Sequence, residues 1–376
     1  MELTRFTFEP GLVSAFVDFG FDHYRGDPRW VPPQRLRLHQ QLDPSFEFYH
    51  LPGNNHCHFL ASQDGCVVGR VTAAVNRQLH DRHGESVGTI GFYECVDDDE
   101  IASELLGAAV SWLRCERGMK QIWGPMNFDI WHGYRFMTNG FDTPGFDTEP
   151  YNKPFYGPQF EGNGFAPLQH WHSVEVTGRS AIEELTAQKA DGYKSLCKRG
   201  YTFHSFDPGR FDDQLTLLHR VFGRSFHRFL GYTPISRDRF AELFAPLRHA
   251  LYPPFFTFAE DDCRNTAGFA MAWHDLSAVL RAMRGRQHML AKLQFLARRR
   301  RSQRIVFYAG GVTPEEEARQ TCLGDVLIYR TLHAILDAGY EDVIVAIMAR
   351  GSPVRHMLGQ HGRRVRRRYT LYRHRP

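Results

Sequence analysis

Long apolar runs, cysteine pairs and lysine are scarce in this 376-residue chain. No apolar run approaches the ~18–20 residues that cross a bilayer, which excludes a transmembrane helix. The N-terminal stretch carries acidic residues within its apolar part and has no basic start, so we do not expect a signal peptide. Seven cysteines, odd in number and irregularly spaced, do not make a disulfide framework. We therefore expect a reduced, cytoplasmic protein.

The residues that are present are those of a folded protein. Hydrophobic residues make up 42% of the chain and aromatic residues 14%, which excludes a disordered polypeptide. At roughly 150 residues per domain, the length predicts two to three domains.

Arginine is concentrated in two runs, although the formal net charge is only +4. Basic runs attract phosphate-rich partners and anionic membranes. A solvated surface explains them equally well, so both interpretations stay open. The first run is Arg298 to Arg301 with Arg304, and the second is Arg363, Arg364, Arg366, Arg367, Arg368, Arg373 and Arg375.

One pattern occurs twice in the chain. Residues 59–75 and 256–273 each contain an apolar run, an acidic turn and a glycine that opens a second apolar run. This pattern predicts two β-hairpins. Each hairpin is followed by apolar residues at helical spacing, by a glycine that ends the helix (Gly118 or Gly339), and by a short apolar strand. The chain is therefore expected to be a duplication of one α/β unit.

The duplication sets the expected domain organisation. We predict an α/β fold with mixed (α+β) sheets in two tandem domains, residues 1–175 and 176–376, because the boundary falls between Gly164 and Thr186. The stretch 123–165 is dense in aromatic and turn residues. It could form the wall of a pocket or a plug between the domains, and composition does not separate the two.

Several segments carry a resemblance to a known family. They are VVGRVTAAVNRQLH and GFYECVDDDE, the GPMNFD turn, the YNKPFYGPQFEGNGF stretch, and LGYTPISRDRF and GVTPEEEARQTCLGDVLIY in the second half. Over residues 28 to 372 the chain resembles the bacterial tandem GNAT-like acyltransferases, the family of bacterial ceramide synthase. The resemblance implies two tandem GNAT-like domains, acyl-CoA as co-substrate and an amine acceptor.

In the second half, the resemblance implies a donor site at the loop before a helix, where backbone N–H groups hold a pyrophosphate. Leucine replaces the family's first loop glycine at position 323. The first half has no glycine in the matching segment, and its aspartates would repel a pyrophosphate. Residues 176–376 are therefore the expected acyl-CoA side, through Val312, Thr313, Gln320, Gly324 and Asp325.

Residues 1–175 are the expected acceptor side. Transfer to an amine needs a group that takes the amine proton and donors that stabilise the oxyanion. The predicted catalytic residues are Glu94 as base, Asn127 as an orienting amide and Tyr156 as a proton donor. Two structural alternatives stay open. Glu94 could be an ordinary solvated residue at a strand end, and Tyr156 could serve only to pack a loop. Predicted substrate-binding residues are Tyr151, Asn152, Trp131 and His132.

Metal and nucleic-acid partners are not favoured. Histidine pairs at 56/58, 80/83 and 170/172 lack a consistent carboxylate partner, so packed or surface histidine is expected and no metal site is predicted. Basic and aromatic residues are not interleaved as in readers of single-stranded nucleic acid.

The sequence thus predicts an acyl-CoA-dependent N-acyltransferase that acts on a small-molecule or lipid amine, with a sphingoid base as the acceptor that the resemblance implies. Two other interpretations stay open. One is an acyltransferase of secondary metabolism that takes its donor from a carrier protein or an aminoacyl-tRNA. The other is a non-catalytic or metal-dependent protein on a GNAT scaffold. Peripheral contact with an anionic membrane is a further expectation.

Overall fold

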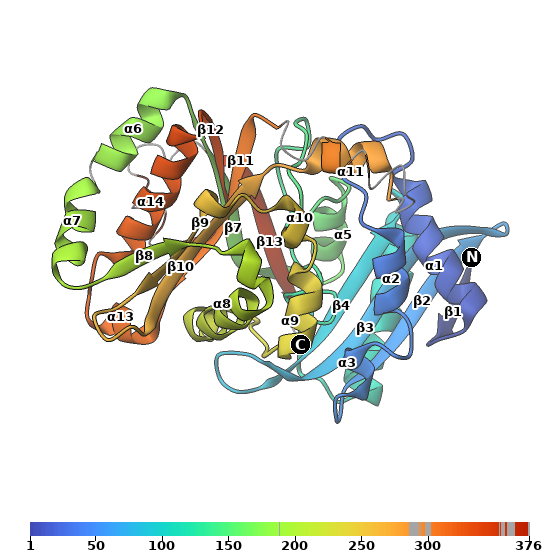
Figure 1. Cartoon of the computed structure of the whole chain (residues 1–376). Helices are drawn as coiled ribbons and strands as arrows, with labels where there is room; N and C mark the ends of the chain where they lie inside the picture. Colours follow the sequence, from blue (N-terminus) through green and yellow to red (C-terminus); the bar gives the residue numbers. More distant parts are fainter. Residues whose placement is uncertain are drawn as a thin grey trace.

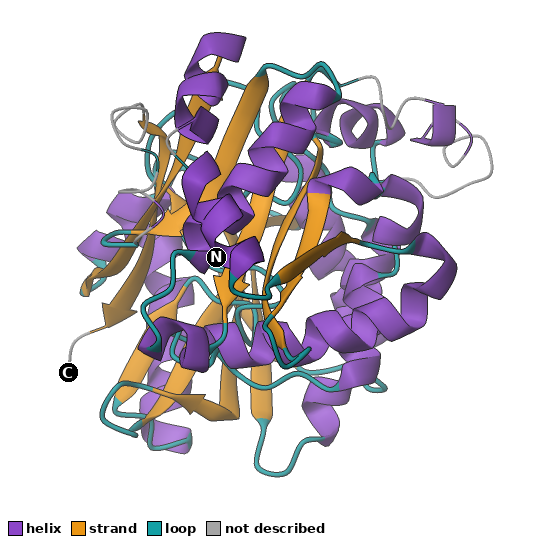
Figure 2. Ribbon diagram, turned by 60° about the vertical axis from the view of Figure 1, so that its left-hand side comes forward, coloured by secondary structure: helices purple, strands orange, loops and turns teal. Residues whose placement is uncertain are grey.

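The structure is a computed structural model that describes residues 1–187, 189–285, 293, 295–297, 302–352, 354, 358 and 365–374. A mixed sheet runs through the described residues in the order β1-β2-β3-β4-β5-β13-β7-β12-β11-β10-β9-β8, with the short β6 paired to β13 (Figure 1). Helices cover both faces of this sheet (Figure 2). The predicted mixed α/β fold is confirmed.

The first half begins at the sheet edge formed by β1. Its elements are β1 (Glu2–Phe6), α1 (Pro10–His23), α2 (Arg35–Gln41), α3 (Glu47–His50), β2 (Asn55–Gln63), β3 (Cys66–His80), β4 (Ser86–Cys95), α4 (Asp99–Ser111) with a π-helical turn to Glu116, β5 (Gln121–Gly124), β6 (Phe136–Met137), α5 (Tyr156–Gly162) and β7 (Phe165–Thr177).

The second half repeats this order after two additional helices. Its elements are α6 (Arg179–Ala187), α7 (Ala190–Lys198), β8 (Thr202–Ser205), α8 (Phe211–Phe226), α9 (Arg237–Phe244), α10 (Leu247–Ala250), β9 (Phe256–Glu260), β10 (Thr266–His274), α11 (Ser277–Met283), β11 (Arg304–Val312), α13 (Pro314–Ala318), α14 (Leu323–Asp337), β12 (Asp342–Ala349) and β13 (Val365–His374), with 3-10 turns at Pro208–Arg210 and Pro253–Phe255.

The predicted duplication is confirmed element by element. β2 and β3 form the first hairpin, and β9 and β10 form the second. Each is followed by a strand, a helix and a parallel strand, namely β4-α4-β5 and β11-α14-β12. Gly118 and Gly339 end the two helices at φ +68° and +84°, the left-handed conformation that glycine adopts without a Cβ clash. The stretch 123–165 is mostly loop, but α5 lies within it.

Helices bury both faces of the sheet in each half. In the first half, α1, α2 and α3 cover one face, and α4 and α5 cover the other. In the second half, α8 and α9 cover one face, and α6, α7 and α14 cover the other. β3 is buried without interruption from Gly69 to Asn76 because it has helices on both of its faces. No helix among the described residues is both long and apolar enough to cross a membrane.

The last strand of the chain lies in the sheet of the first half. β13 is antiparallel both to β5 and to β7, and Tyr372 packs into the core of the first half. β7 in turn pairs with β12 of the second half. The two halves therefore share one continuous sheet at β13 and β7, and the division at residue 175 stays a prediction.

Candidate active site

A buried carboxylate cluster lies at the end of β4. Glu94 faces Arg70 across the β3–β4 ladder, and Arg70 Nη2 lies 3.6 Å from Glu94 Oε1. The hydroxyls of Tyr24 and Tyr156 both donate to Glu94 Oε2, at 2.9 and 2.6 Å. Only 16% of the Glu94 side chain is exposed, so these donors and not water solvate the carboxylate.

Distant segments assemble this cluster. Tyr24 directly follows α1, and Tyr156 is the first residue of α5. The Tyr156 hydroxyl also accepts a hydrogen bond from the backbone N–H of Cys95 at 3.1 Å, which fixes it beside β4. Arg70 Nη1 donates to the carbonyl oxygen of Phe16 in α1 at 2.6 Å. α1, β3, β4 and α5 are therefore joined by one polar network inside an apolar core.

Burial makes Glu94 a better base. Desolvation raises the pKa of Glu94 above its ordinary value, and Arg70 and the two tyrosine hydroxyls oppose this only in part. A carboxylate with a raised pKa holds a transferred proton more firmly near neutral pH. The cluster is therefore suited to accepting a proton from a bound amine.

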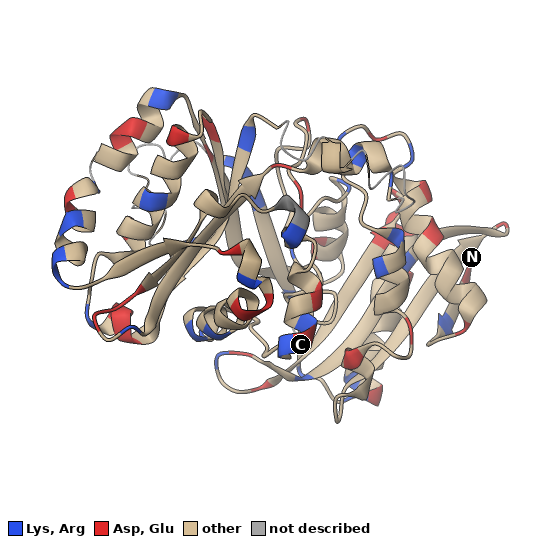
Figure 3. Cartoon of the chain, viewed as in Figure 1, with Lys and Arg blue, Asp and Glu red and all other residues tan. Residues whose placement is uncertain are grey.

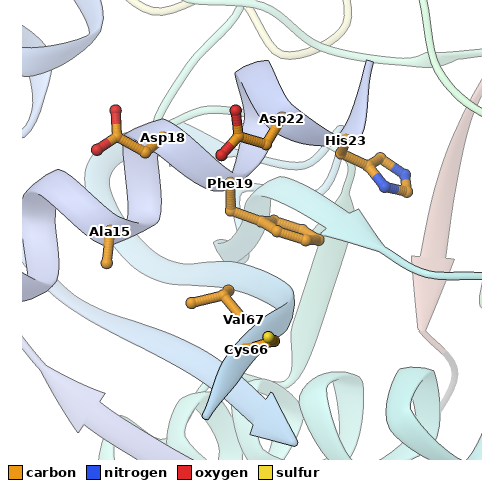
Figure 4. A pocket seen from close by; sticks show the side chains of 7 residues that line it. All are labelled: Ala15, Asp18, Phe19, Asp22, His23, Cys66 and Val67. Atoms are coloured by element: carbon orange, nitrogen blue, oxygen red, sulfur yellow. The ribbon is translucent and has the colours of Figure 1, made fainter. Parts of the chain in front are cut away.

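An open groove lies next to the cluster. It has a volume of about 460 Å³, and Figure 4 shows residues of α1 on one side and the first residues of β3 on the other. Ala15, Phe19 and Val67 supply apolar surface, and His23 lies towards one end. The other lining residues are Asp18, Asp22 and Cys66.

His23 connects the groove to the cluster. Its ring centroid lies 5.3 Å from that of Tyr24, and 6.3 Å from that of Tyr156 with the two planes nearly parallel. Burial, reinforced by the positive charges of Lys153 and Arg70, lowers the pKa of His23 to about 4. The imidazole is therefore neutral at pH 7, and its Nε2 is shielded from solvent with no hydrogen-bond partner among the described residues.

Asn127 uses its side chain within the protein. Its Oδ1 accepts a hydrogen bond from the N–H of Phe92 at 2.6 Å, and its Nδ2 donates to the carbonyl oxygen of His132 at 3.2 Å. Met126 N also donates to the carbonyl oxygen of Ile90. β4 pairs with β5 only up to Thr89, so these bonds close the gap that opens between the two strands.

The four predicted substrate-binding residues are dispersed. Tyr151 donates to Asp27 at 2.7 Å, and its ring lies 5.9 Å from that of Tyr24, at the edge of the cluster. Asn152 is buried and accepts from the N–H of Met137 at 2.7 Å. The other two residues, His132 and Trp131, have their partners away from the cluster.

His132 bonds Asp129, with 2.7 Å between its Nδ1 and the carboxylate. Trp131 donates from Nε1 to the carbonyl oxygen of Thr233 in the second half and packs against Phe222 and Phe240. Of the predicted first-half residues, the structure thus joins Glu94 and Tyr156 directly and brings Tyr151 close to them.

The predicted donor loop of the second half has an open strand edge. β11 pairs with β12 only over 304–307, so 308–312 have no strand on that side among the described residues. Val312 ends β11, Thr313 stands at the N-cap position of α13 without a side-chain capping hydrogen bond, and Gly324 and Asp325 lie in the first turn of α14. No side chain caps α14. Gln320 has φ +51° between the two helices.

Charged side chains already occupy parts of this loop. Lys189 Nζ lies 3.8 Å from Asp325 Oδ1. Glu316 is buried, and its carboxylate accepts hydrogen bonds from Tyr201, Arg319 and Thr321 at 2.8–2.9 Å. In the first half the equivalent helix end is capped, because Asp98 accepts from the N–H groups of Glu100 and Ile101.

Glu94 and the donor loop lie far apart. β5, β13, β7 and β12 separate β4 from β11, and the strand pairing makes β4 and β11 run in opposite directions. At ~4.8 Å between neighbouring strands, five steps amount to roughly 24 Å. The structure therefore does not bring the predicted base and the predicted acyl-CoA loop into one reaction centre.

Three of the five described arginines of these runs are engaged within the protein, and the other two, Arg368 and Arg373, are exposed. Arg304 donates to Asp275, Arg366 pairs with Glu175 at 3.2 Å, and Arg367 pairs with Glu149 at 3.0 Å. Figure 3 shows basic and acidic residues mixed along the outer helices. Membrane contact stays a prediction. Arg298 to Arg301, Arg363, Arg364 and Arg375 lie outside the described residues.

The histidine pairs do not gather metal ligands in the described part of the chain. His56 and His58 are buried among aromatic rings, and His58 Nδ1 lies 2.7 Å from Thr72 Oγ1. The one group of described side chains with the spacing of a metal site is Asp261, Asp262 and Cys263 at an exposed turn, where Asp261 already accepts backbone N–H groups. All seven cysteines are free thiols.

Comparison with known proteins places this geometry in a fold family. No protein-family model matches the chain. A tandem GNAT protein of clavulanic acid biosynthesis covers 99% of this chain and 97% of its own, with a TM-score of 0.52 at 13% identity. A protein of Enterococcus faecalis V583 described as a "Probable N-Acyltransferase" covers 99% of this chain and 72% of its own, with a TM-score of 0.54 at 9% identity. The chain has the tandem GNAT fold.

Two curated sequences are similar to the chain. Protein YghO of Escherichia coli K12 is 24% identical over 258 residues, which cover 66% of this chain and 63% of YghO. Bacterial ceramide synthase of Caulobacter vibrioides is 24% identical over 265 residues, covering 69% and 64%. The chain thus spans less than two thirds of the length of each relative. Within the tandem GNAT fold, it resembles the family of these two proteins.

Proposed function

We propose that the protein is an N-acyltransferase that moves an acyl group from acyl-CoA to an amine. The observation that carries the proposal is the Glu94 cluster, a buried carboxylate with a raised pKa beside an open groove in a GNAT fold. The relative named bacterial ceramide synthase supports a sphingoid base as the first acceptor to test and a long-chain acyl-CoA as the first donor.

The chemistry follows from the cluster. The amine nitrogen attacks the thioester carbonyl, the new C–N bond forms as the C–S bond breaks, and the thiolate leaves. The amine proton passes to Glu94, either directly or through the hydroxyl of Tyr24 or Tyr156. Tyr156 is the predicted proton donor to the leaving thiolate. Asn127 holds the end of β4 in place and is a positioning residue.

The acyl donor is proposed to reach Glu94 through the groove between α1 and β3. Ala15, Phe19 and Val67 offer apolar surface for an acyl chain, and the gap between β4 and β5 is closed by Asn127. A thioester held at β11 would lie roughly 24 Å away by strand spacing, too far for direct proton transfer to Glu94.

A second candidate centre lies in the second half. Its support is the open edge of β11 at 308–312 beside α14, whose N-terminus carries no side-chain cap. There acyl-CoA would be held by Val312, Thr313, Gln320, Gly324 and Asp325, and transfer would proceed without Glu94. A carrier-protein or aminoacyl-tRNA donor fits this opening as well, because both present their acyl group on a long flexible arm.

The test is acyl transfer from palmitoyl-CoA to sphinganine by the whole protein, by Glu94→Gln and by a control, Glu116→Gln. Glu116 is an exposed carboxylate that also pairs with an arginine, Arg5. Activity that is lost in Glu94→Gln and kept in the control supports the proposal. Equal activity in all three removes Glu94 from the mechanism. No thermal stabilisation by any acyl-CoA from acetyl to palmitoyl would favour the carrier-protein, tRNA or non-catalytic alternatives.

A further inference from the structure

No carboxylate among the described residues pairs with Arg135, in contrast to the buried Arg70 and Arg367. Arg70 and Arg367 are 6% and 0% exposed, and each lies within 3.6 Å of a glutamate. Nε and Nη1 of Arg135 are also shielded from solvent, yet no described residue accepts a hydrogen bond from either atom. Leaving guanidinium donors buried and unsatisfied costs free energy. This cost calls for an explanation.

Two aromatic rings lie against the guanidinium, and two tyrosine hydroxyls from the second half lie near it. Its carbon lies 3.8 Å from the ring centroid of Tyr134 and 4.6 Å from that of Trp171 on β7. Burial lowers the pKa of Arg135, and the nearby hydroxyls of Tyr134, Tyr369 on β13 and Tyr308 on β11 oppose this effect. Cation–π contacts stabilise the charge by ~0.5–2 kcal/mol but satisfy no N–H group.

The backbone holds Arg135 in a strained conformation. Its φ is +69°, in the left-handed region that non-glycine residues rarely adopt. The N–H of Arg135 donates to the carbonyl oxygen of Pro125 at 2.9 Å, and the preceding residue, Tyr134, forms a β-bridge with Met126. Backbone strain that the surroundings maintain, at a residue with two unsatisfied guanidinium nitrogens, is typical of binding sites.

We propose that Arg135 binds the carboxylate of a small ligand with an aromatic or aliphatic body. A planar guanidinium pairs with a carboxylate through two parallel hydrogen bonds, and the surrounding rings favour an apolar body next to the charge. Arg135 is partly exposed as a whole while its Nε and Nη1 are shielded, so a carboxylate would meet Nη2 first, and the rings beside the guanidinium would have to shift for a second hydrogen bond. The ligand would contact β7 of the first half and β11 of the second, and would bridge the two. This inference does not depend on Glu94 or on acyl transfer.

The test is thermal stabilisation of the whole protein by carboxylates and their neutral isosteres. The probes are acetate, benzoate and octanoate, each paired with its primary amide, together with inorganic phosphate. The variants are Arg135→Met and Arg135→Lys. The matched control is Arg117→Met, because Arg117 also stacks on a tryptophan, with its guanidinium carbon 4.7 Å from the ring centroid of Trp112.

We expect benzoate or octanoate at about 10 mM to raise the Tm by roughly 2 °C or more, and the amides to have no such effect. Arg135→Met should abolish the rise, Arg135→Lys should reduce it, and Arg117→Met should keep it. Without ligand, Arg135→Met should melt at or above the wild-type temperature, because a residue serving only a ligand does not stabilise the free protein.

Three results would overturn the inference. They are stabilisation by no carboxylate, equal stabilisation by acid and amide, and a rise that survives in Arg135→Met. A response to phosphate alone would also contradict a carboxylate site. A large loss of Tm in ligand-free Arg135→Met would assign the residue a structural role. Acyl transfer by these variants is measured separately, so a failure here leaves the proposed function intact.

Discussion

The two halves repeat one arrangement of elements but differ at the end of the central strand. Arg70 and Glu94 face each other across β3 and β4, whereas Phe269 and Gly311 occupy the corresponding pair on β10 and β11. The first half therefore has a buried acid–base cluster, whereas the second half has a buried phenylalanine ring and a glycine against which Ser225 and Phe226 of α8 pack. A duplication can thus place a buried acid–base cluster in one copy and leave the other without one.

The same contrast extends to the following helix and the neighbouring strand. Asp98 caps α4, and Asn127 closes the gap beside β4. In the second half α14 carries no side-chain cap, and β11 leaves β12 after Phe307. The second half thus has the uncapped helix end and the open strand edge, while the buried acid–base cluster lies in the first half.

The largest expected effect is that of Glu94→Gln. We expect it to lower kcat for acyl transfer by about 100-fold or more, the usual contribution of a general base, with little change in the affinity for acyl-CoA. Because protonation inactivates a base, wild-type activity should fall as the pH drops through the raised pKa of Glu94, and the variant should lose this acidic limb. Full activity of Glu94→Gln from pH 7 to 9 would refute the assignment.

Tyr156→Phe should have a smaller effect. It removes one hydrogen bond to Glu94 and the acceptor for the N–H of Cys95, while Tyr24 still donates to the same carboxylate oxygen. We expect a loss of kcat of about 10-fold and a destabilisation of ~1–3 kcal/mol from the unsatisfied N–H group. Denaturant unfolding and turnover are measured on the same preparation. Unchanged turnover in a destabilised variant would make Tyr156 purely structural.

Asp147→Asn should change how stability depends on pH. Burial, with the neighbouring Asp275, raises the pKa of Asp147 to about 7. The protonated form is thus favoured in the folded state. Its contribution to stability is full below the unfolded pKa of ~3.9 and is lost as the pH rises towards 7.

Asparagine mimics the protonated acid, so Asp147→Asn should flatten the fall in Tm between pH 4 and 8. The matched control is Asp238→Asn, an exposed aspartate that should leave the slope unchanged. A slope as steep in Asp147→Asn as in the wild type would show that another group titrates.

The smallest expected effect is that of Gly324→Val. If transfer takes place at Glu94, a side chain added at the start of α14 should leave kcat within about 2-fold of wild type, because that helix end lies roughly 24 Å away by strand spacing. A loss of acyl-CoA affinity together with activity would move the reaction centre to the second half. The Tm of the variant controls for simple unfolding.

Local patterns allowed much of the fold to be predicted. The hairpins, the two helices and the stops at Gly118 and Gly339 follow from spacing within short windows of sequence, and they are confirmed. The position of β13 in the first half could not be predicted in this way. It depends on which strand edges remain open after the whole chain has folded.

The candidate site, too, could be predicted only where the signal lies within a short window of sequence. Glu94 was predicted from its place at the end of a strand and Tyr156 from the YNKPFY stretch that carries the resemblance, and the two are in contact. Tyr24 and His23 were missed because the end of α1 meets β4 only in three dimensions. Arg70 left a signal, since a charged residue interrupts the apolar run of β3 and therefore needs a buried partner. The amide of Asn127 was assigned to a substrate because sequence does not show which backbone N–H groups need an acceptor.

The most direct test of the account is where the acyl donor binds. Hydrogen exchange would be compared with and without a non-hydrolysable thioether analogue of palmitoyl-CoA. We predict protection in α1 and at the end of β4, around residues 10–24 and 90–96, because the groove and Glu94 lie there. Protection confined to 308–325, with none in α1 or β4, would contradict the account and place the reaction centre in the second half.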